Sequence, residues 1–155
     1  MCPLHHPNLV RLYGGVWNEG ADKLCIVLEY CGNGSFKTFL KEDTGTWEDL
    51  RHGLALGAAH GLAYLHHELK EPLIHRDVKP GNLLVGVLDV PTEASPFGGF
   101  VAKLADFGES THFDNKLAKE NADYDGDDAL TMTMVGTQLY CAPEIMMGLR
   151  CKYCD

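Results

Sequence analysis

Two short runs of strand-forming residues open the chain, at residues 9–17 (LVRLYGGVW) and 23–30 (KLCIVLEY). The stretch NEGAD, rich in turn-forming residues, separates them. β-Branched, aromatic and aliphatic runs joined in this way predict an antiparallel hairpin. The following segment, CGNGS, interrupts the pattern, and Ser35 is placed to cap a short helix that ends at Leu40.

The clearest helical pattern runs from Trp47 to about Glu68, and Thr46 and Asp49 have the spacing of a capping box at its start. Apolar residues then recur at steps of three and four and define one face: Leu50, Leu54, Ala58, Leu62 and Leu65. Three glycines also recur at steps of four: Gly53, Gly57 and Gly61. Although each glycine costs roughly 1 kcal/mol relative to alanine, this stripe predicts that another helix can approach closely.

The second half alternates between apolar runs and polar loops. Residues 72–88 predict an apolar run, a polar loop and a second apolar run, and residues 100–108 predict a further strand after a surface loop at 91–99. The segment from 109 to about 130 shows neither helical nor strand periodicity, whereas residues 131–148 again have the pattern of ordered structure. This mixture predicts an α+β fold.

Charge and composition narrow the class of protein. A hydrophobic content of 45% suits a globular domain, and the net charge of −9, without a basic stripe, argues against nucleic acid or an anionic membrane as the main partner. Between residues 106 and 128, eight acids and two lysines give −6 of this charge, which favours a solvated loop. Because no apolar run could cross a bilayer and no signal-peptide pattern opens the chain, we expect an intracellular, cytoplasmic location.

Two segments have partial metal-site patterns. The motif CKYC at 151–154 has zinc-site spacing, but no second ligand pair completes it, so the six cysteines are expected to be reduced thiols. The segment NADYDGDD at 121–128 begins like a calcium-binding loop, but Met132 stands where the bidentate glutamate belongs. An acidic surface insertion explains this segment better.

The octapeptide HRDVKPGN at 75–82 has the residues that phosphoryl transfer to a hydroxyl requires. Asp77 supplies a carboxylate to orient the nucleophile, and Lys79 supplies a cation for the phosphoryl oxygens. Asn82 offers an oxygen ligand for a hard cation such as Mg²⁺, and Asp106 downstream adds a charged ligand. Pro80 and Gly81 allow the chain to turn so that these side chains converge.

These motifs together resemble those of a protein kinase. The tripeptide HRD lies at 75–77, the loop asparagine is Asn82, DFG lies at 106–108 and APE at 142–144. HPN at 6–8 is similar to the loop between the family's helix C and fourth strand, and residues 25–35 are similar to its fifth strand and hinge. The resemblance implies an incomplete kinase fold, with residues 1–30 as the end of the N-lobe and hinge and 31–155 as part of the C-lobe.

The resemblance also implies roles for single residues. Asp77 is similar to the catalytic base and Lys79 to the phosphate-contacting lysine. Asn82 and Asp106 are similar to the magnesium ligands. The implied cofactors are therefore ATP and Mg²⁺, and the implied partner is a protein substrate.

Further positions match the family's nucleotide site and its internal framework. The four that would border the nucleotide are Leu28 as gatekeeper, the backbones of Glu29 and Cys31, and Leu84 beneath the base. Leu12, His75 and Phe107 match three positions of the regulatory spine. Asp155 matches the helix F aspartate.

Lys79, together with GTQLYCAPE at 136–144, resembles serine/threonine rather than tyrosine kinases, and the hinge style resembles the tyrosine-kinase-like group. Arg76 could pair with a phosphate on the activation segment. The regulatory candidates are Thr131, Thr133 and Thr137. The alternative interpretation of the first two is that they are exposed loop hydroxyls.

The family's glycine-rich loop, its VAIK-type lysine and its helix C glutamate have no match in this sequence. We therefore expect an internal piece of a kinase domain with an exposed apolar helix face. In isolation, these residues are expected to show poor solubility or partial folding, weak or absent ATP binding and no turnover. The alternative is a non-catalytic interaction protein that binds a partner kinase or the remainder of its own domain.

Overall fold

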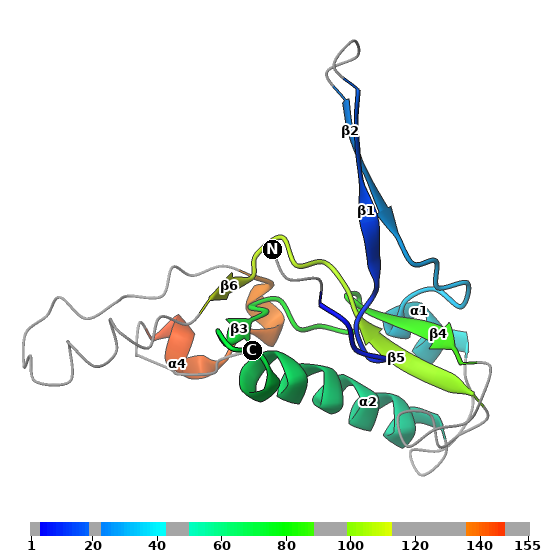
Figure 1. The fold of residues 1–155 in the computed structure, drawn as a ribbon. Coiled ribbons are helices and arrows are strands. Elements are labelled where there is room, and N and C mark those ends of the chain that lie inside the picture. The colour runs from blue at the N-terminus through cyan, green and yellow to red at the C-terminus, as the bar shows by residue number, and fades with distance from the viewer. Residues whose placement is uncertain (1–3, 19–22, 43–49, 89–98, 113–135, 148–155) are drawn as a thin grey trace, which may run out of the picture. The chain divides into compact units, whose positions relative to one another are not determined.

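The computed structural model describes residues 4–18, 23–42, 50–88, 99–112 and 136–147. The chain divides into two compact units, of which the first contains Met1–Gly61 and Pro80–Ala105 and the second Leu62–Lys79 and Asp106–Asp155. Their helices and strands appear in Figure 1. The mixture of helices and strands confirms the predicted α+β class.

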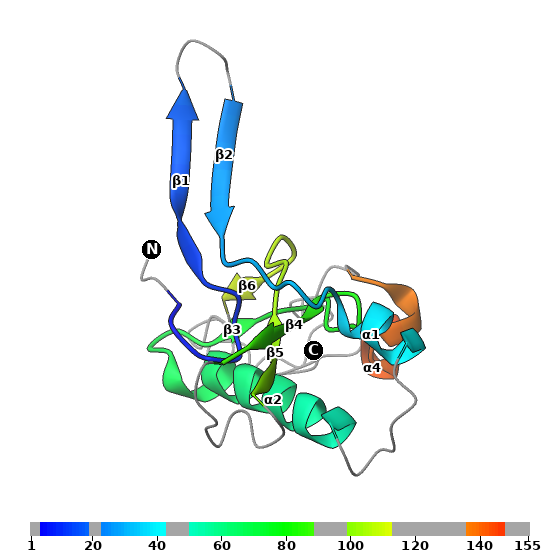
Figure 2. The same cartoon turned by 90° about the vertical axis from the view of Figure 1, so that its right-hand side faces the viewer.

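The predicted N-terminal hairpin is confirmed in the first unit. Strands β1 (Leu12–Asn18) and β2 (Lys23–Leu28) pair antiparallel, and the Glu29 N–H extends the pairing by donating to the Arg11 carbonyl at 2.8 Å. Figure 1 and Figure 2 both show this hairpin extending away from the other strands of its unit.

Apolar side chains on the hairpin are exposed on both faces, because a two-stranded sheet has no second layer to cover it. The exposed set is Leu12, Tyr13, Val16, Trp17, Leu24, Ile26, Val27 and Leu28. Trp17 retains 65% of its accessible surface. An apolar surface of this extent is typical of a face that another element or partner covers.

The rest of the first unit contains a short helix and a strand pair. Helix α1 (Phe36–Glu42) follows Ser35, whose hydroxyl accepts the Thr38 N–H at 3.2 Å, so the predicted cap is confirmed. Strands β4 (Leu83–Val87) and β5 (Phe100–Leu104) pair antiparallel. Val85, Val101 and Leu104 from these strands are fully buried in the core.

The predicted long helix is present as α2 (His52–Ala63), continued by a wider π-helical turn, η2 (Tyr64–Glu68). Its apolar face is not exposed, contrary to the expectation from the sequence. Leu54 and Ala58 are buried in the first unit, and Leu65 is buried in the second. Among the described residues, the largest group of exposed apolar side chains lies on the hairpin instead.

A strand and a loop, rather than the predicted helix, pack against the glycines of α2. A Cβ atom added to Gly57 would lie 2.7 Å from Nδ2 of Asn8 and 3.6 Å from Cβ of Ala102. One added to Gly61 would lie 2.9 Å from both the Asn8 carbonyl oxygen and Cδ1 of Leu104. The glycines therefore allow the segment around Asn8 and strand β5 to pack directly on the helix backbone.

The second unit contains β3 (Leu73–Ile74), β6 (Thr111–His112), a 3₁₀ turn η3 (Gln138–Tyr140) and helix α4 (Pro143–Met146). Strands β3 and β6 pair antiparallel. Strand β6 falls in a segment predicted to lack periodicity. Two residues are too few to produce a period, and the pairing with β3 defines this strand.

Several predictions lie outside the described residues. They are the Thr46–Asp49 capping box, the loop at 91–98, the regulatory candidates Thr131 and Thr133, the acidic segment at 121–132, CKYC at 151–154 and Asp155. Within the described part of the chain, no helix is both long and apolar enough to span a membrane.

Candidate active site

The HRD segment follows directly from strand β3 in the second unit. His75 is fully buried, and its Nδ1 accepts the Asp77 N–H at 3.3 Å. Arg76 between them has a φ of 67°, in the left-handed region that non-glycine residues rarely adopt. This backbone conformation, which costs about 1–2 kcal/mol, sets the local course of the chain between His75 and Asp77.

Asp77 is the centre of a compact polar cluster with Lys79 and Thr137. Its Oδ2 pairs with Nζ of Lys79 at 2.5 Å, and its Oδ1 accepts both the Thr137 N–H at 3.0 Å and the Thr137 hydroxyl at 2.9 Å. Nζ of Lys79 also donates to Oγ1 of Thr137 at 2.7 Å. The carboxylate is 9% exposed and is therefore a nearly buried charge that these three donors stabilise.

Gly136 explains why the Thr137 segment can approach so closely. Its φ is 97°, and a Cβ atom at this position would collide with the carbonyl oxygen of Arg76. The same Cβ would lie 3.6 Å from Oδ1 of Asp77. Glycine therefore satisfies two requirements at once, a left-handed backbone and a close contact with the HRD segment.

The DFG segment lies beside the HRD segment within the second unit. The rings of His75 and Phe107 have centroids 5.0 Å apart, and β3 pairs with β6 a few residues away from both motifs. Asp106 also has a left-handed φ, 63°, and its Oδ1 accepts the Gly108 N–H at 3.4 Å. This carboxylate is exposed, so its oxygens are accessible to a ligand.

Arg76 also holds the start of the segment after DFG, because its Nε donates to the Glu109 carbonyl. This contact shows that the guanidinium can reach the chain downstream of DFG, where the sequence predicts a phosphate partner for it. Of the three regulatory candidates only Thr137 is described, and its hydroxyl contacts Asp77 and Lys79.

The four residues predicted to border a nucleotide lie in the first unit. Glu29, Cys31 and Leu84 are buried or half-buried, whereas Leu28 is exposed. The hinge segment is attached to β4, since the Gly34 carbonyl accepts the Val85 N–H at 2.9 Å. The arrangement therefore fixes the hinge against the strand that carries Leu84.

Cys31 is a buried thiol in this hinge. Burial raises its pKa above the ordinary value of 9.0, the charge of Glu29 raises it further, and Lys103 opposes both effects. Within the described residues, Cys25, Cys31 and Cys141 are free cysteines.

Asn82 is buried in the first unit, and its carbonyl accepts the Ala105 N–H at 2.9 Å. Throughout the described ranges, no group of three or more His, Cys, Asp or Glu side chains could hold a metal ion. That finding is compatible with a magnesium site, because Mg²⁺ is usually held by one or two side-chain oxygens together with substrate phosphates and water.

A cavity of about 260 Å³ in the first unit is lined by Glu29 and Lys103. Leu28, Cys31 and Leu84 are absent from its walls, so this cavity is not the predicted nucleotide site.

The sequence indicated no role for Lys103 or for the Glu29 side chain, and it predicted a regulatory role for Thr137. The motif GTQLYCAPE drew attention to Thr137, but no pattern in the sequence indicated that Thr137 contacts Asp77 and Lys79.

Comparison with known proteins identifies the family of this chain. A family model for the protein kinase domain matches residues 1–154. The chain belongs to the protein kinase family. Among its relatives, the LRR receptor-like serine/threonine-protein kinase RGI1 of Arabidopsis thaliana is 42% identical over 118 residues, which cover 74% of this chain and 10% of the relative.

Two further relatives have similar names. The receptor-like serine/threonine-protein kinase ALE2 of Arabidopsis thaliana is 38% identical over 93% of this kinase chain and 16% of its own length. The G-type lectin S-receptor-like serine/threonine-protein kinase LECRK2 of Oryza sativa subsp. indica is 46% identical over 66% of this chain and 11% of its own. The chain thus matches only a small part of each of these relatives.

Proposed function

We propose that this chain carries the catalytic loop and activation segment of a protein serine/threonine kinase, which transfers the γ-phosphoryl group of ATP to a serine or threonine hydroxyl. The observation that supports this most strongly is the cluster of Asp77, Lys79 and Thr137. In it, an aliphatic hydroxyl donates to Oδ1 of Asp77 and accepts from Lys79. A substrate alcohol needs the same two kinds of partner.

In the proposed reaction, Asp77 orients the substrate hydroxyl and accepts its proton as the oxygen attacks the γ-phosphorus. The bond from the γ-phosphorus to the bridging oxygen breaks, and ADP leaves with that electron pair. Lys79 stabilises the negative charge on the transferring phosphoryl oxygens. Thr137 holds Asp77 and Lys79 in position, since its hydroxyl contacts both.

Asn82 and Asp106 are the proposed magnesium ligands, because both offer the oxygen atoms that this hard cation prefers. When bound, Mg²⁺ would neutralise phosphate charge. Among the hinge residues, Glu29 would use its carbonyl for the adenine, since its N–H already donates to Arg11. A reaction that consumes ATP implies an intracellular location, and the substrate is a protein.

The proposal is tested by incubating the protein, purified from its own cells at its natural length, with Mg²⁺, radiolabelled ATP and peptide mixtures that contain serine, threonine or tyrosine as acceptor. We expect label on the serine and threonine peptides only. Label confined to tyrosine would contradict the proposed specificity, and transfer in the presence of EDTA would contradict the metal requirement.

A non-catalytic interaction protein is the second candidate, and the exposed apolar surface of the β1–β2 hairpin favours it. If this second candidate is right, the Asp77→Asn variant will retain the full cellular effect of the wild-type protein. Loss of that effect, with the variant still folded, supports catalysis.

A further inference from the structure

Lys103 is an almost fully buried lysine next to the last residue of strand β5. It retains 4% of its accessible surface, and its Nζ donates to the Pro7 carbonyl at 2.9 Å and pairs with Oε1 of Glu29 at 3.0 Å. An unpaired lysine in such a place would be costly, so these two acceptors determine where the ammonium group lies. The side chain therefore joins β5 to two other segments of the same unit.

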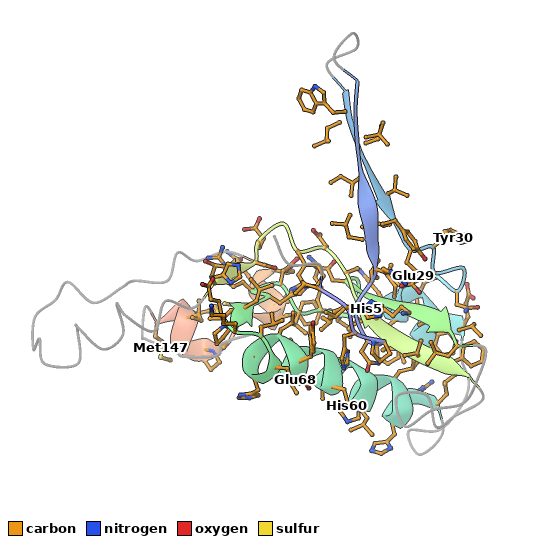
Figure 3. The ribbon with its side chains drawn as sticks, in the orientation of Figure 1. His5, Glu29, Tyr30, His60, Glu68 and Met147 are labelled. Carbon is orange, nitrogen blue, oxygen red and sulfur yellow. The ribbon has the colours of Figure 1, made fainter. Side chains whose placement is uncertain are left out.

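Glu29 carries this connection into the hairpin. Its Oε2 accepts the Arg11 N–H at 3.1 Å, and its own N–H donates to the Arg11 carbonyl at 2.8 Å. Figure 3 shows Glu29 at the base of the hairpin, where β2 leads into the hinge. Both carboxylate oxygens are thus engaged, one with the lysine and one with the backbone that precedes β1.

The neighbouring strand is shaped to admit the lysine. A Cβ atom at Gly86 in β4 would lie 3.0 Å from Cε and 3.2 Å from Cδ of Lys103. Both distances are shorter than ordinary carbon–carbon contacts of about 3.5–4.0 Å. Any larger residue at position 86 would therefore displace the aliphatic part of the lysine side chain.

We infer that Lys103 is a positioning residue that fixes the hinge peptide from Glu29 to Cys31 on the β4–β5 pair, and thereby pre-forms the surface that receives the base of the nucleotide. The effect on nucleotide binding rests on the proposed function. The ordering of the hinge by Lys103 rests only on the contacts of Lys103 with Glu29 and Pro7. A hinge that is already ordered loses less conformational entropy when the nucleotide binds. A change that disorders the hinge therefore weakens nucleotide affinity.

The test compares Lys103→Met with Lys37→Met, which removes an exposed lysine from α1. For Lys103→Met we expect KM for ATP to rise by about three- to tenfold with kcat within about twofold of wild type, because the change affects binding and not the reacting groups. Glu29→Gln should act in the same direction, and the double variant should be no worse than the stronger single variant. Lys37→Met should change neither parameter.

Amide hydrogen exchange gives a readout that does not depend on catalysis. Faster exchange at the Arg11 and Glu29 amides in Lys103→Met, but not in Lys37→Met, is the expected result. If wild-type protein binds no nucleotide, the proposed function fails, and the exchange result alone decides the structural part. Unchanged exchange, or equal losses in kcat and kcat/KM, would overturn the inference.

Gly86→Ala provides a second variant in case Lys103→Met does not fold, because it displaces the lysine stem while keeping its charge. It should raise KM for ATP and accelerate exchange at the same two amides. A Gly86→Ala protein with wild-type KM and exchange would also overturn the inference.

Discussion

Replacing Thr137 with valine removes one hydroxyl from the cluster of Asp77, Lys79 and Thr137 and keeps the shape of the side chain. The lost contacts are the hydrogen bond to Oδ1 of Asp77 at 2.9 Å and the one from Nζ of Lys79 at 2.7 Å. The backbone N–H of residue 137 still donates to Asp77 at 3.0 Å, so the carboxylate keeps a partner on that side. The change therefore affects positioning more than folding.

The expected loss follows from the strength of these contacts. A hydrogen bond to a charged group contributes about 1.5–3 kcal/mol. The Lys79 side chain is 25% exposed, so water can replace part of the lost interaction and the lower end of that range applies. Since each 1.4 kcal/mol changes a rate by about tenfold, we expect kcat to fall by about tenfold.

The assay measures initial rates of peptide phosphorylation at saturating ATP for wild type, Thr137→Val and Thr137→Ser. Serine keeps the hydroxyl, so its kcat should stay within about threefold of wild type. Far-ultraviolet circular dichroism checks that all three proteins are folded. Equal kcat values for the valine and serine variants would refute the role assigned to the hydroxyl.

Three further outcomes follow from the structure. Gly57→Ala should lower the free energy of unfolding in urea by about 1–3 kcal/mol, because the added methyl group meets Asn8; higher stability would contradict this packing. Iodoacetamide at pH 7.5 should alkylate the exposed Cys25 at least about tenfold faster than Cys31, because Cys31 is buried and its raised pKa keeps the thiol protonated. Equal alkylation rates would contradict this burial. The contribution of the Cys31 thiol to folding stability is fully present below pH 9.0, and it is lost as the pH rises through the pKa of the folded state. Gly136→Ala should lower kcat at least as much as Thr137→Val, because a Cβ would collide with the carbonyl oxygen of Arg76; wild-type kcat would count against that contact.

The elements that local sequence determines were predicted well. The hairpin followed from two strand-forming runs and a turn, the cap of α1 from the hydroxyl of Ser35, and α2 from the repeat of apolar residues. In each case the residues that define the element lie within a few positions of one another, and their pattern contains the structural information.

The contacts that were not predicted join residues far apart in the sequence. Lys103 and Pro7 are 96 positions apart, and Thr137 and Asp77 are 60 apart. The partner of the glycine stripe was mistaken for a helix, because spacing shows that something approaches but does not show what approaches. The tertiary arrangement alone brings such pairs together.

The central claim is that Asp77 serves phosphoryl transfer, and one measurement tests it most directly. Phosphate incorporation into serine and threonine peptides is compared for wild type, Asp77→Asn and Glu68→Gln, the last of which neutralises an exposed carboxylate at the end of η2. We predict that Asp77→Asn lowers kcat by at least about a hundredfold while Glu68→Gln leaves it unchanged. Equal phosphate incorporation by folded wild-type and Asp77→Asn protein would contradict the account.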